Sequence, residues 1–153
     1  MKEQVQAEFK KIFNGRFSTA QSTRANYARG EDTYDPVLSK AVVFPETNEE
    51  VSKILRLCNE HKIPVVPFGT GTSLEGNVVG NDKGITISLE KMNKILSVNA
   101  TDFDCRVQAC VTKEQLNEYL REDGVFFPID PGANAAIGGM ASTSASGLSL
   151  IHI

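Results

Sequence analysis

Two segments built almost entirely from small residues constrain this chain more than any other feature. The first runs from Pro67 to Asn77 (PFGTGTSLEGN), directly after the strand-like pair Val65-Val66. The second runs from Asp130 to Gly147 (DPGANAAIGGMASTSASG). Glycines let backbone N–H groups converge on one anion, and short hydroxyls add donors at the rim. The first segment therefore predicts a phosphate or pyrophosphate site, and the second permits close approach of a backbone or a flat ring and can also hold an anion.

The first segment matches neither of two common phosphate-binding signatures. It lacks the Gly-Lys-Ser/Thr of a P-loop, and Leu74 stands where the dinucleotide motif G-x-G-x-x-G needs its third glycine. Each segment also has a simpler interpretation, a surface turn for the first and close helix packing for the second. The presence of both in one chain favours a long dinucleotide as the ligand.

The composition is that of one ordinary soluble domain. The chain has 153 residues, of which 41% are hydrophobic, and a formal charge of −3. Because no Lys/Arg cluster occurs, we expect no nucleic-acid partner. No stretch has the length of a transmembrane segment. The N-terminus, MKEQVQAEFKKIF, lacks the apolar run of a secretory signal, so we expect a cytoplasmic protein.

Cysteine and histidine offer little chemistry. Cys58, Cys105 and Cys110 form no C-x-x-C pair and are expected to be small buried hydrophobes. With only His61 and His152 present, we expect no metal site and no histidine-based triad. We therefore assign no catalytic residue.

Periodicity predicts the elements of the first half. Helical spacing of Val5, Phe9, Ile12 and Phe13 predicts a helix that packs on the domain. A short buried strand is expected at 41–44. Thr47 and Glu50 form a capping box that starts a helix, whose buried face is expected to contain the residues at i, i+3, i+4 and i+7, namely Val51, Ile54, Leu55 and Cys58.

The second half reads as a strand, a hairpin, a helix and a last strand. Ile85, Ile87 and Leu89 alternate with polar residues. Segments 95–98 and 103–109 flank a turn, with Phe103, Cys105, Val107 and Ala109 expected on the buried face. Thr112 and Gln115 form a second capping box, with Val111 and Leu116 as a hydrophobic staple and Gly124 as the left-handed end. Residues 125–127 are expected to form a strand. This order predicts an α+β fold, with residues 41–147 as one packed unit.

At the two small-residue segments the sequence resembles the FAD-binding domain of the vanillyl-alcohol-oxidase-type (PCMH-type) flavoproteins, in the D-lactate dehydrogenase and glycolate oxidase branch. The resemblance rests on VVPFGTGTSLEG (65–76), FFPIDPGA (126–133) and IGGMASTSASG (137–147), with AVVFPETNEEV (41–51) at the entrance. It implies the N-terminal portion of a domain in which two small α/β subdomains hold FAD between them. Residues 1–40 would be a helical extension and 41–147 an incomplete FAD-binding domain.

The resemblance also implies the residues that hold the cofactor. The first segment would wrap the pyrophosphate, the turn at 130–133 would line the flavin side, and the glycine-rich run after it would contact the pyrophosphate and ribityl group. The implied set is Pro67, Gly69, Thr70, Gly71, Thr72, Ser73, Gly76, Asn77, Asp130, Pro131, Gly132, Ala133, Ile137, Gly138, Gly139, Ser142, Ser146 and Gly147. No histidine lies in the first segment, so non-covalent FAD is expected.

Residues 148–153 do not resemble the family's continuation, and we expect the sequence to break there. The family's substrate arginine and catalytic histidine would lie beyond that point. The resemblance implies that a whole protein oxidises a D-2-hydroxy acid, D-lactate or glycolate, and passes electrons to a cytochrome, quinone or oxygen, which would place it peripherally at a membrane. A non-catalytic nucleotide-binding fragment and another PCMH-type flavoenzyme, such as a cell-wall reductase or an ether-lipid synthase, are the alternatives.

Overall fold

The computed structural model describes residues 3–146, and its contacts divide the chain into two compact units, Met1–Lys91 and Met92–Ile153. The division falls inside the stretch 41–147, which we expected to pack as one unit, and the N-terminal helix belongs to the first unit. Each unit has a hydrophobic core of its own. Within residues 3–146, no helix combines the length and the apolar character that crossing a bilayer would require.

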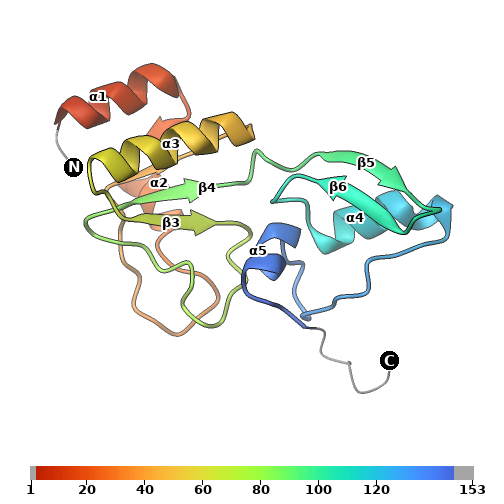
Figure 1. The fold of residues 1–153 in the computed structure, drawn as a ribbon. Helices are drawn as coiled ribbons and strands as arrows, with labels where there is room; N and C mark the ends of the chain where they lie inside the picture. The colour runs from red at the N-terminus through yellow and green to blue at the C-terminus, as the bar shows by residue number, and fades with distance from the viewer. Residues whose placement is uncertain (1–2, 147–153) are drawn as a thin grey trace. The chain divides into compact units, whose positions relative to one another are not determined.

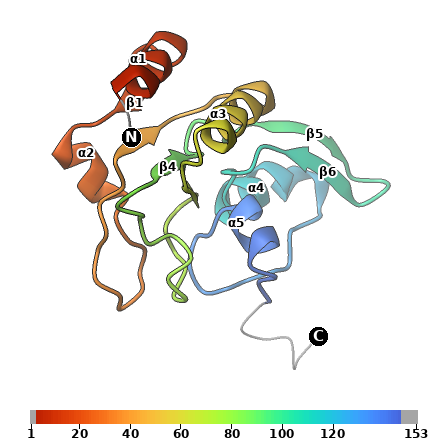
Figure 2. The same cartoon turned by 60° about the vertical axis from the view of Figure 1, so that its left-hand side comes forward.

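The first unit contains a four-stranded sheet with helices on it (Figures 1 and 2). The strand order is β1-β2-β4-β3, in which β2 and β3 both run parallel to the central strand β4, and β1 runs antiparallel to β2. Its elements are α1 (Glu3–Ile12), β1 (Phe17–Ser18), α2 (Gln21–Asn26), β2 (Ala41–Val43), α3 (Asn48–Glu60), β3 (Val65–Phe68) and β4 (Ile85–Ser88). The predicted N-terminal helix, the helix that starts after Thr47 and the strands expected around residues 41–44, 65–66 and 85–89 are confirmed, and the structure shows that these three strands run parallel.

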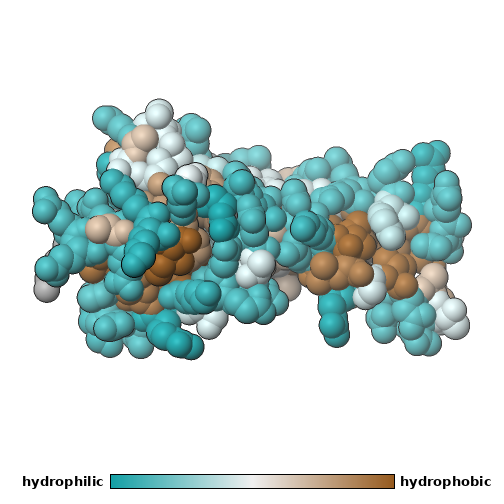
Figure 3. Space-filling model, turned by 90° about the horizontal axis from the view of Figure 1, so that it is seen from above, coloured by the Kyte–Doolittle hydropathy of each residue, from teal (hydrophilic) through white to brown (hydrophobic). Residues whose placement is uncertain are grey.

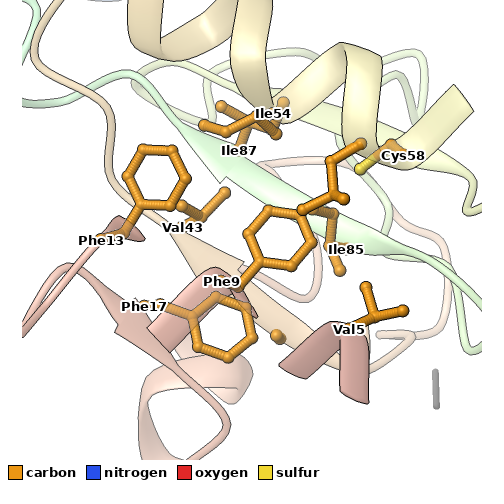
Figure 4. Close-up of a cluster of buried hydrophobic side chains, with 11 residues drawn as sticks. Val5, Phe9, Phe13, Phe17, Val43, Ile54, Cys58, Ile85 and Ile87 are labelled. Atoms are coloured by element: carbon orange, nitrogen blue, oxygen red, sulfur yellow. The ribbon is translucent and has the colours of Figure 1, made fainter. Parts of the chain in front are cut away.

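The core of the first unit lies between the sheet and the helices α1 and α3 (Figure 4). Phe9 is fully buried and stacks on Phe17, with ring centroids 5.2 Å apart. From α3 the buried side chains are Ile54, Leu57 and Cys58. The expectation for Leu55 is wrong, since it is 47% exposed. The buried face of α3 is centred on Ile54, Leu57 and Cys58, and Leu55, about 100° around the helix from Ile54, lies outside it.

The N-terminus of α3 is capped as predicted, but its reciprocal bond goes elsewhere. The Glu50 amide donates to the Thr47 hydroxyl, at 3.2 Å. The Glu50 carboxylate accepts from the Glu46 amide and from both terminal nitrogens of Arg16, at 2.6 Å each. The hydrogen bonds from Arg16 lower the pKa of Glu50 to about 2. The ion pair thus ties the entry to β1 to the start of α3.

All four residues of the central strand β4 are buried, so its side chains on both faces are covered by other parts of the protein. Thr86 therefore points into the protein, where its hydroxyl donates to the Ser39 hydroxyl at 2.8 Å. Ile85 and Ile87 point to the opposite side, into the core with α1 and α3.

The second unit contains a β-hairpin and two helices. Its core consists of Val111, Leu116 and Leu120, with Ile95, Val98 and Val107 of the hairpin packed against it. The Thr112 cap, the Val111–Leu116 staple and the left-handed Gly124 are confirmed. Its elements are β5 (Ile95–Asn99), β6 (Asp104–Val107), α4 (Lys113–Leu120), the 3-10 turn η1 (Arg121–Asp123) and α5 (Ile137–Ser142).

Three expectations for this unit are wrong: the burial of Phe103, the burial of Cys105 and the strand at 125–127. Phe103, which has a φ of +55° in the turn, is 83% exposed, and Cys105 is also exposed. Leu96 of the hairpin is also exposed, by 55%. Figure 3 shows that hydrophobic residues reach the surface on the side seen from above.

Residues 125–127 form no strand. The side-chain amide of Asn117 takes the place of a partner strand: its oxygen accepts from the Phe127 amide at 2.7 Å, and its nitrogen donates to the Phe127 carbonyl at 3.3 Å. Phe126 is left 72% exposed.

Candidate functional site

The first small-residue segment begins where the parallel strands end. Pro67 is the third residue of β3, paired with Ile87 of β4, and β3 is an edge strand, where a missing N–H is tolerated. The glycine-rich loop, residues 69–80, follows at the carboxyl end of the strand. Ligands of open α/β sheets bind outside the carboxyl ends of parallel strands. The topology thus puts this loop where such a ligand is expected.

Two carbonyls, one just before the glycine-rich loop and one within it, accept hydrogen bonds from other parts of the protein. These bonds fix the orientation of the peptide groups to which the carbonyls belong. The Phe68 carbonyl accepts from the Leu89 amide, and the Gly71 carbonyl accepts from the Glu31 amide, both at 2.9 Å. In a trans peptide the N–H points opposite to the C=O. The amides of Gly69 and Thr72 consequently point away from these partners, and neither donates to any residue in the range 3–146.

Gly71 and Gly76 shape the loop through their left-handed backbone, with φ of +77° and +72°. Each also lies against an aromatic ring. A Cβ on Gly71 would lie 2.8 Å from Cζ of Phe68, and a Cβ on Gly76 would lie 2.7 Å from Cε2 of Tyr34. Both positions therefore require glycine for conformation and for space.

The polar side chains of the loop are neutral donors and acceptors. The hydroxyls of Thr70 and Thr72 lie 3.3 Å apart. Ser73 Oγ accepts from the Asn77 side-chain amide at 3.0 Å and from the Glu75 amide at 3.4 Å, which leaves its own proton to donate. No Lys or Arg lies in 67–77. The amides of Gly69 and Thr72, which donate to none of residues 3–146, and the hydroxyls of the loop form a donor set that fits a phosphate group held by neutral hydrogen bonds.

The turn at 130–133 belongs to the second unit and is held by α4. Asp130 Oδ1 accepts from Lys113 Nζ at 2.9 Å and from the Gly132 amide at 3.0 Å. These two hydrogen bonds lower the pKa of Asp130. The Lys113 amide also donates to the Ala135 carbonyl at 3.0 Å. Lys113 thus fixes the turn from both its backbone and its side chain, a role the sequence pattern did not predict.

The run after this turn forms α5, and part of it is committed to packing. The amides of Ile137 and Gly138 donate to the carbonyls of Val111 and Ala109, at 2.8 Å each. A Cβ on Gly138 would lie 2.8 Å from Ala109, so this glycine permits close backbone packing. These two residues would therefore reach a cofactor through other atoms than their amides.

The remaining predicted residues of this run lie at its surface or outside the description. Ser142 donates to the Gly138 carbonyl at 2.8 Å and, like Gly139 and Ser146, is exposed. Gly147 and the tail 148–153 lie outside the described residues. The predicted cofactor residues form two groups, one in each compact unit: the loop residues 67–77 in the first and residues 130–146 in the second.

Comparison with protein families identifies one match across most of the chain. The model of the FAD binding domain family matches residues 39–152. Among curated proteins, the chain is 39% identical over 151 residues to the probable mitochondrial D-lactate dehydrogenase of Danio rerio, which covers 98% of this chain and 30% of that protein. It is 38% identical over 143 residues to the mitochondrial D-lactate dehydrogenase (cytochrome) of Arabidopsis thaliana, 92% of this chain and 25% of that protein.

Comparison with solved structures gives the same fold. Alkyldihydroxyacetonephosphate synthase superposes with a TM-score of 0.86 at 20% identity, over 96% of this chain and 30% of the synthase chain. At that identity the likeness concerns the fold alone. The chain therefore spans less than a third of the length of these proteins.

Proposed function

The chain belongs to the FAD binding domain family, and from this premise we propose that it is the nucleotide-binding part of a flavoprotein that oxidises a D-2-hydroxy acid, D-lactate or glycolate. The cofactor is FAD, held without a covalent bond. The glycine-rich loop binds its pyrophosphate, and the turn at 130–133 lines the flavin side. The 39% identity to a D-lactate dehydrogenase supports this substrate class over the others that the fold serves.

The orientation of the loop's peptide groups is the observation that most favours FAD. The amides of Gly69 and Thr72 point away from the partners of the adjacent carbonyls and donate to none of residues 3–146, so they can donate to pyrophosphate oxygens. Hydroxyls of Thr70, Thr72 and Ser73 add donors. Because every donor is neutral, FAD binding depends more on the direction of the N–H and O–H groups than on the net charge of the loop. We therefore expect the affinity for FAD to depend only weakly on salt concentration.

The chemistry would come from the cofactor and the binding from this chain. When bound, FAD would supply the acceptor for a hydride from the hydroxyl-bearing carbon of the acid and a route for the electrons to a cytochrome, quinone or oxygen. The residues described here hold and orient the cofactor and exclude water from its phosphates. No base for the hydroxyl proton is assigned among them.

The cofactor proposal is tested by titrating the purified 153-residue chain with FAD and recording the quenching of flavin fluorescence. Saturable binding is expected, and acid precipitation should release all flavin into the supernatant because no covalent bond forms. Flavin retained in the precipitate would contradict non-covalent binding. Lack of any saturation would contradict the assignment of the loop.

The reaction is tested in the whole protein of which we propose this chain to be a part, by anaerobic reduction of its flavin. D-lactate or glycolate should bleach the flavin absorbance band, and L-lactate serves as the stereochemical control. Reduction by NADPH alone would instead identify a reductase on the same fold. Loading with FAD but no reduction by any of these compounds would favour a non-redox relative such as the synthase.

A further inference from the structure

The glycine-rich loop rests on a segment that precedes the family match. Residues 28–37 lie before residue 39, where that match begins, and they run beside the loop in both ribbon views (Figures 1 and 2). Two backbone hydrogen bonds join them: the Glu31 amide donates to the Gly71 carbonyl at 2.9 Å, and the Gly80 amide donates to the Ala28 carbonyl at 3.0 Å. The loop is thus fastened to this segment near its beginning and at its end.

Gly30 lies close against the first part of the loop. A Cβ on Gly30 would lie 2.5 Å from the Gly71 carbonyl oxygen, 3.0 Å from the Ser73 carbonyl oxygen and 2.7 Å from Cγ2 of Val78. Its φ is not in the left-handed region, so alanine could adopt the same backbone. The requirement for glycine at this position therefore comes from the space that the two loop carbonyls and the Val78 side chain occupy, and not from the backbone conformation.

Asp32 shapes the segment around this contact. Asp32 is buried, with 8% of its surface exposed. One carboxylate oxygen accepts from the Gly30 amide at 3.2 Å and the other accepts from the Tyr34 amide at 3.0 Å. The ring of Tyr34 then lies against Gly76, the last glycine of the loop motif. Asp32 therefore joins two of the residues that contact the loop, Gly30 and Tyr34.

We propose that Gly30, Glu31 and Asp32 are positioning residues for FAD binding, which act by turning the carbonyls of Gly71 and Ser73 toward residues 30–31. Because N–H and C=O point in opposite directions in a trans peptide, this turns the amides of Thr72 and Leu74 toward the ligand side. Neither amide donates to any described residue. The inference rests on the proposed function, since it names what prepares the same loop for a pyrophosphate.

The test compares two glycine substitutions in the 153-residue chain. Gly30→Ala inserts a methyl group against the Gly71 carbonyl. Gly84→Ala is the matched control, because its Cβ would lie 2.4 Å from the Pro64 carbonyl oxygen, in the same unit but away from the loop. Thermal unfolding of the apoprotein measures the structural damage of each, and FAD fluorescence quenching measures the Kd. We expect both to lower the Tm, and only Gly30→Ala to raise the Kd, by about tenfold for one misdirected hydrogen bond to a charged group.

A milder pair of variants keeps the test decisive if Gly30→Ala does not fold. Asp32→Ala removes both acceptors, and Asp32→Asn retains one acceptor oxygen. FAD affinity should fall in the order wild type, Asp32→Asn, Asp32→Ala. Affinity unchanged in both variants, or increased in Asp32→Asn because a repelling charge was removed, would overturn the proposal.

The titration of the wild-type chain with FAD distinguishes failure of the proposed function from failure of this inference. If the wild-type chain binds no FAD, the proposed function fails and the inference falls with it. If the wild type binds FAD but Gly30→Ala weakens binding no more than Gly84→Ala at equal loss of Tm, the inference alone is wrong.

Discussion

Gly71 must be glycine for two separate reasons, its backbone conformation and the space around it. The backbone has a φ of +77°, and a Cβ would lie 2.8 Å from the Phe68 ring, which is 7% exposed. Gly15 has nearly the same φ, +74°, but nothing lies within 4 Å of its Cβ position. The two glycines therefore allow the conformational cost to be separated from the collision.

Gly71→Ala should destabilise the chain by more than Gly15→Ala. The left-handed backbone alone costs an alanine about 1 to 2 kcal/mol, which both variants share. Displacement of Phe68 adds to this only at position 71, and FAD binding should weaken only there. Urea unfolding followed by circular dichroism, together with FAD titration, measures both effects. Equal unfolding free energies and equal FAD affinities for the two variants would show that the collision with Phe68 adds no cost at position 71.

The Arg16–Glu50 pair predicts a dependence of stability on pH. The folded-state pKa of Glu50 is about 2, below its ordinary value of 4.5. A depressed carboxylate pKa stabilises the fold above the unfolded pKa, and this contribution is lost as the pH falls from 4.5 toward 2. Glu50→Gln should cost about 1 to 3 kcal/mol at pH 7 and should flatten the fall of stability in that window.

The control for this prediction is Glu60→Gln, an exposed residue at the other end of α3. Denaturant unfolding at several pH values between 7 and 2 compares the two variants with the wild type. A Glu50→Gln profile that keeps the wild-type slope below pH 4.5 would show that the ion pair does not couple to folding.

At the level of elements, Asn117 replaces a strand partner for Phe127. Its side-chain amide both accepts from and donates to the Phe127 backbone. Asn117→Ala should destabilise the second unit by about 1 to 3 kcal/mol, because two partly buried backbone groups lose their partner. Asn117→Asp keeps the acceptor for the Phe127 amide and should fall between alanine and wild type.

Glu118→Ala provides the comparison for Asn117, since Glu118 is the next residue of α4. Its ion pair with Arg121 is 76% exposed on both sides, and such pairs contribute little. Unfolding free energies from urea titration should rank Glu118→Ala near wild type. An unfolding free energy of Asn117→Ala near that of the wild type would mean that water replaces the two lost hydrogen bonds. The conformation of residues 125–127 would then need another explanation.

At the level of the whole molecule, two separate cores predict two regions of protection. The core around Ile54 and the core around Leu116 share no residue. Thr47→Ala and Thr112→Ala each remove a helix cap, which costs about 1 kcal/mol. Native-state hydrogen exchange should show faster exchange in the first unit for Thr47→Ala and in the second unit for Thr112→Ala. Equal acceleration of both units by either variant would mean that they open as one.

The sequence by itself determined the parts of this protein that depend on local chemistry. The caps at Thr47 and Thr112, the staple at Val111 and the left-handed Gly124 follow from residues within a few positions of one another, and the structure contains them. The family could likewise be inferred from two contiguous motifs, because a phosphate loop needs small residues in unbroken order. The assignment of individual cofactor residues remains a prediction.

Only the tertiary structure decided the features that join distant parts of the chain. No periodicity places Leu55 outside and Leu57 inside, because that depends on where the sheet lies against α3. No local sequence pattern relates the residues of three contacts: Asn117 bonds to Phe127, Lys113 bonds to Asp130, and Gly30 packs against Gly71. Backbone donors and acceptors that are removed from water need hydrogen-bond partners, and the fold decides which residues are near enough to serve. The sequence between two such residues does not indicate that they will meet.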